Sequence, residues 1–429
     1  MNRAPTDLPE SFLEAVRGLR RAFPEPASPY RLPLTQNTFG DLEIAAALEA
    51  LVRGPMTQGP RVAAFEAEFA RAHAAADAVF CNSGSSANLL MLSAMSRPGD
   101  VGARGGPAPG DEVIVPAVTW STTLWPVIQV GGVPVLADVS PDTLNLTVES
   151  VERALSPRTR AVLAVHLLGN PAPVDALADL CRRKGLVLIE DCCEALDADL
   201  GGRKAGTFGR MGSYSFYFSH HISTIEGGMV LCADPEDAQR LRILRAHGWT
   251  RQMPETARRA VERAHPDLDP RFLFVDVGYN LRGTDLQAAL GRVQFARRAG
   301  FLARRREAAA AWGAARDRHA NLFLPFAASP GSSHFAFPLV LRPGTAATRQ
   351  GLIDHLEARG VETRPLVAGN LARQPALGRL PHRIAGPLTG ADTLHERAIY
   401  IGIHPMLSDE QIALLPPLLD EFGRGAGVS

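Results

Sequence analysis

The chain has 429 residues, which is long enough for one large domain with a smaller one, or for two domains of medium size. It carries 45 basic and 45 acidic side chains and 46% hydrophobic residues, an ordinary globular composition without net charge. This balance gives no general attraction to nucleic acid or to an acidic membrane. Among the basic residues only Lys184 and Lys204 are lysines. An enzyme that needs a Schiff-base lysine would have to use one of these two.

Targeting signals and thiols point to one compartment. The N-terminal segment lacks the basic start and apolar run of a secretory signal, and no apolar stretch reaches the roughly 18 residues that span a bilayer. The five cysteines are few, odd in number and mostly set in apolar segments, as is typical of buried thiols in a reducing environment. We therefore expect a cytoplasmic protein.

Short β-rich apolar runs alternate with helical stretches along the first half of the chain. Strands are predicted at 78–82, 112–116, 133–139, 161–167, 186–191, 213–218 and 228–234. Helices are predicted at 86–95, 121–131 and 173–185. The Gly/Pro-rich segment 101–110 predicts a loop, and the polar, Arg-rich segment 251–272 predicts an excursion over the surface. The alternation indicates an α/β fold with a mostly parallel sheet.

The last third of the chain reads as a long helix followed by a smaller unit. The helix is predicted over 295–320, and a strand, a helix and a second strand follow at 334–342, 348–360 and 361–367. We expect three parts, which are an N-terminal helical arm over 1–29, a large domain over 30–300 and a small C-terminal α/β domain over 301–429.

Several motifs carry chemistry. A Gly-Ser-Ser turn at Gly84 joins a strand to a helix, where backbone N–H groups and the helix dipole suit a phosphate. Trp120 follows a strand end, the place of ligand crevices in α/β sheets, although a core tryptophan is the alternative. Asp191 ends another strand and could pair with a protonated ring nitrogen, or belong to a solvated acidic pair with Glu190.

Two adjacent histidines, His220 and His221, lie between the last two predicted strands of the sheet. Paired histidines suggest a metal, but neighbouring side chains diverge and no third ligand pattern is nearby. We therefore expect no metal site, and we interpret His221 as a structural neighbour of His220.

The order of these motifs resembles the DegT/DnrJ/EryC1/StrS sugar aminotransferases, a family of fold-type I pyridoxal-phosphate (PLP) proteins. The matching segments include NSGSSANLL, VIVPAVTW, VLIEDCCEALDA, SFYFSHHISTIEGGMV and GYNLRGTDLQAALG. The resemblance implies an aspartate aminotransferase-like fold, with PLP or pyridoxamine phosphate (PMP) bound in the large domain.

The same resemblance implies roles for individual residues. Gly84, Ser85 and Ser215 would hold the cofactor phosphate, and Asn280 would reach it from a neighbouring subunit, so a homodimer with shared active sites is implied.

The remaining implied cofactor contacts concern the pyridine ring. Trp120 would stack on the ring, Asp191 would pair with its nitrogen, and Glu194 would lie near its hydroxyl.

One departure from the family changes the expected reaction. Its aminotransferases have a lysine five residues beyond the serine of the Ser-Phe motif, and here that position is His220. Neither Lys184 nor Lys204 is at the expected place, so we expect no covalent link between cofactor and chain. A histidine can still move protons near neutral pH. The substitution resembles the NDP-4-keto-6-deoxyhexose 3-dehydratase branch, as do HGW (247–249) and the segments 362–375 and 391–405.

That branch implies a PMP amine condensing with the sugar's C4 ketone, proton removal from the cofactor's C4′ by His220, and loss of the C3 hydroxyl. One type of this enzyme binds an iron–sulfur cluster through four cysteines after HGW and takes electrons from a partner reductase. Residues 250–272 contain no cysteine, which favours the cluster-free type, in which L-glutamate regenerates PMP.

His247, Arg364 and Arg373 are candidates for contacts with the nucleotide-linked sugar, because arginine suits phosphate groups. The nucleotide, the sugar, and the pathway (lipopolysaccharide or antibiotic biosynthesis) stay open. Two other functions also remain as alternatives, a sugar aminotransferase that uses Lys184 or Lys204, and a non-catalytic PLP-binding protein of the same fold.

Overall fold

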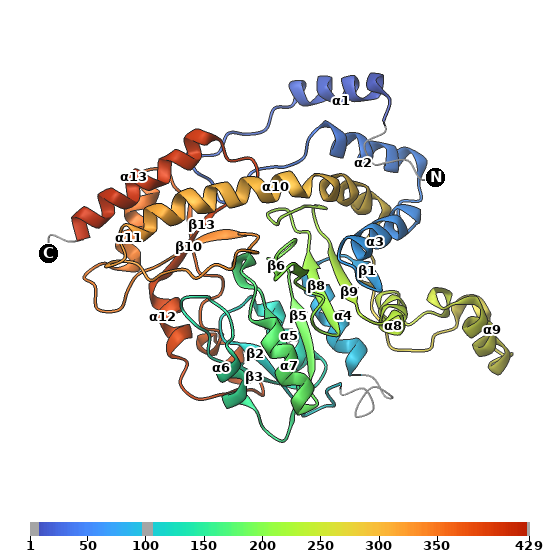
Figure 1. Ribbon diagram of the computed structural model, residues 1–429. Helices are drawn as coiled ribbons and strands as arrows, with labels where there is room; N and C mark the ends of the chain where they lie inside the picture. The colour runs from blue at the N-terminus through green and yellow to red at the C-terminus, as the bar shows by residue number, and fades with distance from the viewer. Residues whose placement is uncertain (1–7, 97–105, 427–429) are drawn as a thin grey trace.

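The computed structural model describes residues 8–96 and 106–426, and an eight-stranded sheet lies at its centre (Figure 1). The strand order is β1-β9-β8-β5-β4-β2-β3-β12. Its strands are β1 (Asp77–Cys81), β2 (Glu112–Pro116), β3 (Val133–Ala137), β4 (Thr159–Val165), β5 (Val187–Asp191), β8 (Met211–Ser215), β9 (Gly228–Cys232) and β12 (Arg383–Ile384). Strand β9 alone runs in the direction opposite to the other strands of this sheet. The prediction of an α/β fold with a mostly parallel sheet is confirmed.

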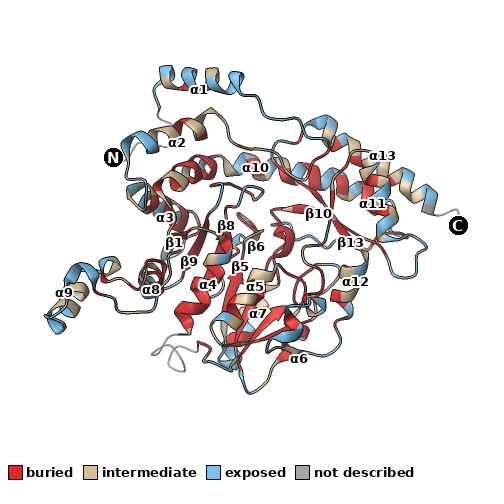
Figure 2. Ribbon diagram, turned by 180° about the vertical axis from the view of Figure 1, so that it is seen from behind, coloured by how far each residue is buried: buried red, intermediate tan, exposed pale blue. Residues whose placement is uncertain are grey.

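Helices cover both faces of the sheet, which is why its middle strands are almost wholly apolar. The covering helices are α4 (Gly84–Met95), α5 (Ser121–Gln129), α6 (Val148–Ala154), α7 (Val174–Lys184) and α8 (Pro235–Arg245). Most of α4 is buried, because it packs on β8 and β9 and also on α5 and α8 (Figure 2). This buried helix begins at the carboxyl edge of the sheet, so its first residues are held rigidly there.

A second unit contains a three-stranded antiparallel sheet in the order β10-β13-β11. Its elements are β10 (Ala336–Val340), α11 (Arg349–Glu357), β11 (Thr363–Pro365), α12 (Thr389–Arg397), β13 (Ala398–Gly402) and α13 (Asp409–Ala426). Helix α10 (Asp285–Asp317) contributes to the cores of both units and passes residue 300 without a break. Strand β12 returns to the large sheet beside β3. The domain limits at residues 29 and 300 stay a prediction.

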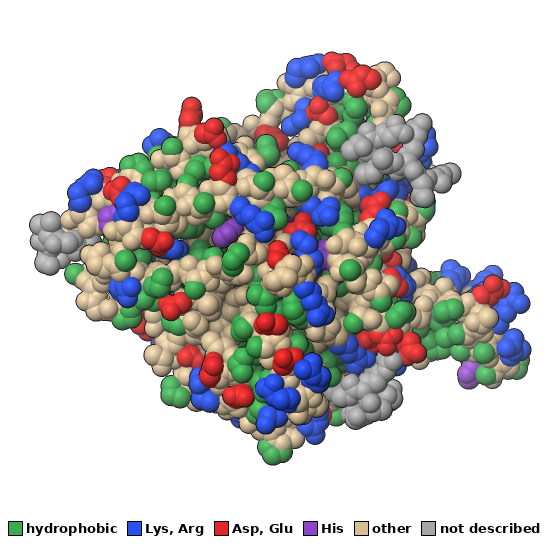
Figure 3. Space-filling model, in the orientation of Figure 1, with side chains coloured by type: hydrophobic (Ala, Val, Ile, Leu, Met, Phe, Trp, Pro, Cys, Tyr) green, Lys and Arg blue, Asp and Glu red, His purple; other side chains and the backbone are tan. Residues whose placement is uncertain are grey.

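The chain begins with three helices, α1 (Glu10–Ala22), α2 (Asp41–Arg53) and α3 (Pro60–Ala72). The expected surface excursion is present, since α9 (Glu255–Ala264) projects from the body and buries none of its residues (Figures 1 and 2). Acidic and basic side chains are interspersed over the face in Figure 3, as the zero net charge suggests. Among the described helices none is long and apolar enough to cross a membrane.

Some predicted boundaries differ from the structure. The long helix begins ten residues earlier than predicted, because Thr284 and Gln287 form a capping box that starts α10 at Asp285. The strand predicted over 213–218 ends at Ser215, where the chain leaves the sheet and enters the turns that carry His220. Part of the loop predicted over 101–110 lies outside the described residues, and 106–110 form neither helix nor a named strand.

A two-stranded hairpin, β6 (Asp199–Leu200) with β7 (Arg203–Lys204), lies between β5 and β8 in the chain. It leads into the turn 206–209, whose backbone is bound by Glu190 of β5. This contact ties the connection to the end of β5.

Candidate active site

A cavity of about 500 Å³ opens where β4, β5 and β8 end at Val165, Asp191 and Ser215. The carboxyl edge of a parallel sheet is the usual ligand site of α/β folds. Eight of the residues singled out in the sequence line it, namely Gly84, Ser85, Trp120, Asp191, Glu194, Ser215, His220 and Arg364. The fold therefore brings together side chains that are spread over 281 positions of the chain.

The N-terminus of α4 forms one wall of this cavity. Ser83 caps the helix by accepting a hydrogen bond from the Ser86 amide at 3.1 Å, and the Ser85 hydroxyl lies 2.8 Å from that of Thr122. The first N–H groups of a helix lack partners within it, so they are available to an anion.

A glycine is required at the start of α4. A Cβ on Gly84 would lie only 2.5 Å from the Cβ of Ser215 and 2.9 Å from the Sγ of Cys193. The missing side chain lets the helix terminus meet the end of β8, and this close approach forms the cradle that suits a phosphate group.

Asp191 is held by donors from three different elements. Its Oδ2 accepts hydrogen bonds from Asn88 at 2.8 Å and Thr123 at 2.7 Å, and its Oδ1 accepts one from the Cys193 amide at 3.0 Å. Ser213 in turn donates to Asn88 at 2.6 Å. Only 4% of Asp191 is exposed, so the alternative of a solvated acidic pair does not hold. Oδ1 retains acceptor capacity and can receive a further proton-bearing ligand atom.

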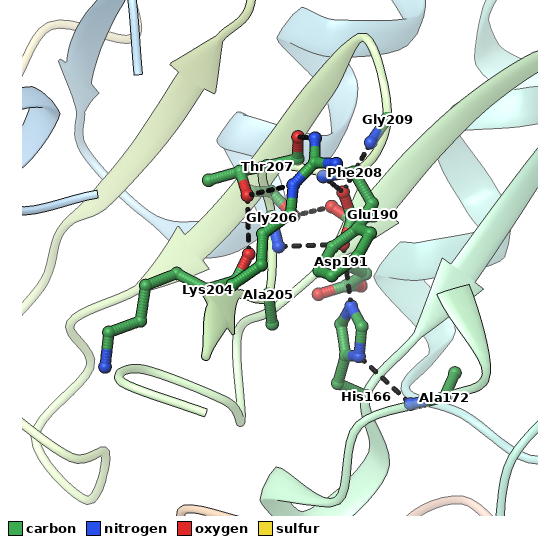
Figure 4. A network of polar contacts seen from close by, with 12 residues as sticks. His166, Ala172, Glu190, Asp191, Lys204, Ala205, Gly206, Thr207, Phe208 and Gly209 are labelled. Carbon is green, nitrogen blue, oxygen red and sulfur yellow. Dashed lines mark hydrogen bonds and ion pairs between the residues drawn. The ribbon is translucent and has the colours of Figure 1, made fainter. Parts of the chain in front are cut away.

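The neighbouring Glu190 points to the other side of β5 and binds the turn at 206–209 (Figure 4). Its oxygens accept hydrogen bonds from the amides of Gly206, Phe208 and Gly209, each at 2.7 Å, and from His166 Nε2 at 3.1 Å. The Nδ1 of His166 accepts a hydrogen bond from the Ala172 amide at 3.1 Å. His166, Glu190 and Cys192 lie close enough together to suggest a metal. Because the carboxylate and both ring nitrogens already have partners, this cluster is structural.

His220 lies in the turn after β8, and its imidazole ring faces two aromatic rings. The centroid of Phe335 is 5.0 Å away and that of Tyr217 is 5.9 Å away, both edge-on. Its Nδ1 is buried, with no hydrogen-bond partner among the described residues. Burial, and then the charge of Arg305, lower the pKa of His220 to about 3. The ring is therefore neutral at physiological pH.

His221 turns away from the cavity. Its Nε2 lies 3.1 Å from the carbonyl oxygen of Ser333, and only 6% of the residue is exposed. The two adjacent histidines thus point in different directions, as the sequence analysis expected.

Neither lysine lies in the cavity. The Nζ of Lys204 donates to the Asp197 carbonyl at 3.2 Å and pairs with that residue's carboxylate at 3.3 Å. Figure 4 shows this side chain leading away from Asp191. Lys184 is in the last turn of α7. An aminotransferase that forms its Schiff base on either lysine is therefore not supported by their positions.

Three other candidates occupy the cavity wall. Trp120 precedes α5 and is 58% exposed, so it is not a core tryptophan. Glu194 accepts a hydrogen bond from the Leu168 amide at 2.8 Å. Burial raises the pKa of Glu194 to about 7, with Asp191 adding to the increase and the Leu168 amide opposing it. Arg364, on β11, pairs with Glu362 at 2.9 Å.

Three candidates do not line this cavity. Arg373 pairs with Asp392 at 2.7 Å and with Glu396 at 2.8 Å. The exposed Asn280 accepts hydrogen bonds from Arg282, whose guanidinium also lies 3.4 Å from His247.

Several residues of the site were not predicted from the sequence. Asn88, Thr122, Thr123, Phe335 and Tyr400 also line the cavity. Asn88 could have been found, because it lies one helical turn after Gly84 and so shares its face of α4. Phe335 and Tyr400 belong to the second unit, and no local pattern relates them to this sheet edge.

Comparison with known proteins identifies the family. The profile of the DegT/DnrJ/EryC1/StrS aminotransferase family matches residues 37–415. The chain belongs to this family. Among its relatives, GDP-4-keto-6-deoxy-D-mannose 3-dehydratase of Yersinia pseudotuberculosis is 36% identical over 89% of this chain and 96% of its own. dTDP-4-dehydro-2,6-dideoxy-D-glucose 3-dehydratase of Saccharopolyspora spinosa is 38% identical over 88% of this chain and 83% of its own.

Solved structures agree with the fold. A GDP-4-keto-6-deoxymannose-3-dehydratase with a trapped PLP–glutamate geminal diamine superimposes with a TM-score of 0.83 at 32% identity. The match covers 91% of this chain and all of that one. The prediction of a fold-type I, aspartate aminotransferase-like architecture is thereby confirmed for this member of the DegT/DnrJ/EryC1/StrS family.

Proposed function

We propose that this protein is a PLP/PMP-dependent 3-dehydratase, which removes the C3 hydroxyl of a nucleotide-linked 4-keto-6-deoxyhexose. The observation that carries the proposal is His220, a histidine placed in a cavity that has the phosphate cradle and Asp191 but no lysine. Two relatives that are named as 3-dehydratases match this chain over most of their length, and they support the same reaction class.

The residues of the cavity fit the cofactor. The start of α4 at Gly84 and Ser85, with the nearby Ser215, suits its phosphate, and the exposed face of Trp120 suits its ring. Asp191 has acceptor capacity for the ring nitrogen. Pyridoxamine phosphate, when bound, supplies a primary amine and an electron-withdrawing ring.

His220 moves the proton in this proposal. Its imidazole would accept a proton at the cofactor's C4′ carbon and would deliver it to the C3 hydroxyl, which would leave as water. Burial lowers the pKa of His220 to about 3, so the ring is in the neutral form that can accept a proton. Glu194 follows Asp191 by three residues. We propose that it faces the hydroxyl of the cofactor's pyridine ring.

The partners follow from the same proposal. We infer that L-glutamate regenerates PMP and that no iron–sulfur cluster is used, because the segment after HGW contains no cysteine. The two relatives are named for different nucleotide sugars, so the nucleotide stays open. All five cysteines are free thiols, which favours a reducing compartment and hence the cytoplasm.

We also infer a homodimer. Asn280 does not line its own chain's cavity, which is compatible with the contact to a second copy that the family resemblance implies. Arg373 is already neutralised by two carboxylates, so its proposed contact with the substrate has weaker support than that of Arg364.

The test is a panel of nucleotide-linked 4-keto-6-deoxy sugars, each incubated with the protein, PLP and glutamate and analysed by mass spectrometry. We expect a 3-deoxy-4-keto product from at least one member. His220→Asn should abolish this product while the protein still binds PLP. His220→Lys should also abolish dehydration, and a 4-amino sugar that keeps its C3 hydroxyl is then the expected product.

Formation of a 4-amino sugar by the wild-type protein would contradict the proposal and favour the aminotransferase alternative. Binding of PLP without turnover of any panel member would favour the non-catalytic alternative. Size-exclusion chromatography with light scattering tests the homodimer separately.

A further inference from the structure

Arg305 is a buried arginine directly behind the wall of the cavity. It lies on α10 and is 1% exposed. Within residues 8–96 and 106–426 no carboxylate forms an ion pair with it, whereas the other two buried arginines of this part of the chain, Arg245 and Arg316, each have one. A buried positive charge without a counter-charge is costly, which calls for a reason for its position.

The guanidinium instead binds backbone carbonyls of the second unit. Its Nη1 donates to the carbonyl of Phe335 at 3.0 Å, to that of His334 at 3.3 Å, and to that of Ile403. Phe335 immediately precedes β10 and Ile403 immediately follows β13. One side chain therefore fixes the backbone at the adjoining ends of two strands.

These hydrogen bonds from Arg305 affect His220 through Phe335. The Phe335 amide donates to the Leu168 carbonyl at 2.9 Å. Both polar backbone groups of Phe335 are therefore bound, its carbonyl by Arg305 and its amide by Leu168. Its ring then meets the imidazole of His220 at a centroid distance of 5.0 Å. Because Nδ1 of His220 has no described hydrogen-bond partner, ring packing orients this imidazole.

The charge of Arg305 also reaches the histidine. It lowers the pKa of His220, after burial, and it acts in the same direction on His221, His334 and His404. Other titratable or charged groups face the same cavity from the remaining walls. These are Asp191, Tyr217, Glu194, Glu226, Arg364 and Tyr400.

We propose that Arg305 is a positioning residue for His220, which it orients by fixing the backbone of Phe335. The proposal rests on the role given to His220 above. In serine hydrolases a carboxylate orients the catalytic histidine and stabilises its protonated form. Here a cation is near the histidine, so the protonated ring is destabilised and has a strong tendency to pass its proton on.

The test measures the reactivity of His220 without any substrate. Diethyl pyrocarbonate modifies neutral imidazole, and peptide mass spectrometry of the full-length protein gives the rate at His220 between pH 5.5 and 8. In the wild type the rate, corrected for reagent hydrolysis, should stay nearly constant. In Arg305→Gln the backbone of Phe335 loses the hydrogen bond from Arg305, so the rate at His220 should rise several-fold at every pH, and the profile should stay nearly flat because burial still lowers the pKa of His220. Arg305→Lys keeps a cationic donor for the same carbonyls and should return the rate toward that of the wild type.

Arg316 provides the matched control. It lies on α10 eleven residues later, is 6% exposed, and pairs with Asp317 at 2.6 Å. Arg316→Gln should leave the rate at His220 unchanged. A wild-type rate in folded Arg305→Gln, or an equal rise in Arg316→Gln, would overturn the proposal.

A second variant covers the case in which Arg305→Gln does not fold. Phe335→Leu removes the ring but keeps the charge, so the rate at His220 should rise several-fold at every pH without a change in its pH dependence. An unchanged rate in this variant would overturn the orienting role. Because no substrate is present in either experiment, failure here is distinct from failure of the proposed dehydratase activity.

Discussion

Gly84→Ala tests whether the cradle at the start of α4 depends on a missing side chain. The added methyl carbon would lie 2.5 Å from Ser215 Cβ and 2.9 Å from both Ser215 Oγ and Cys193 Sγ. Ordinary contacts begin near 3.4 Å, so the helix and the strand must separate by almost 1 Å. Ser215 Cβ is attached directly to the backbone of β8 and cannot rotate away. Such overpacking of a buried site costs roughly 1–3 kcal/mol of unfolding free energy.

The same displacement should weaken cofactor binding, because it moves the helix N–H groups away from Ser215. A loss of about 1.4 kcal/mol corresponds to a tenfold weaker affinity for PLP. Urea denaturation without cofactor measures the first effect, and quenching of tryptophan fluorescence by PLP measures the second. The control is Gly313→Ala in α10, where nothing lies within 4 Å and stability should rise by roughly 0.5–1 kcal/mol. Wild-type stability and affinity in Gly84→Ala would refute the reasoning.

Three further predictions concern the surroundings of the site. Thr123→Val removes a buried 2.7 Å donor to Asp191, so urea denaturation should show a loss of roughly 1.5–3 kcal/mol; an unchanged midpoint would contradict the role of this contact. Burial lowers the pKa of His334 to about 4 and that of His404 to about 3, so unfolding takes up protons below pH 6.5. Stability should therefore fall from pH 6.5 to 5 by roughly 1.5 kcal/mol for each, and a pH-independent unfolding free energy there would be the contrary result. Borohydride reduction with PLP should leave no cofactor on Lys204, and Lys204→Arg should keep wild-type activity because it preserves the surface ion pair; a labelled Lys204 peptide would revive the aminotransferase alternative.

The sequence was sufficient for much of the fold because the relevant signals are local. Apolar runs such as 112–116 and 228–234 coincide with strands of the sheet, since a strand that is buried on both faces must be apolar on both. The start of α10 was predicted ten residues too late, although the Thr284–Gln287 capping box that sets it can be recognised in the sequence.

The type of reaction was also predicted from the sequence alone. The chain has only two lysines among its 45 basic residues, and the resemblance to the family implies that His220 stands where its aminotransferases have a lysine. Both points favour dehydration over amino transfer and need no knowledge of the tertiary structure.

Only the tertiary structure decided how these residues are held. Asp191 receives its hydrogen bonds from α4, α5 and the turn after β5, and His220 meets Phe335 from a separate unit of the fold. Nothing in the sequence distinguishes Arg305, 85 positions beyond His220, from the other arginines of the chain. Its burial depends on how α10 packs between two sheets, and periodicity within one segment carries no information about such long-range packing.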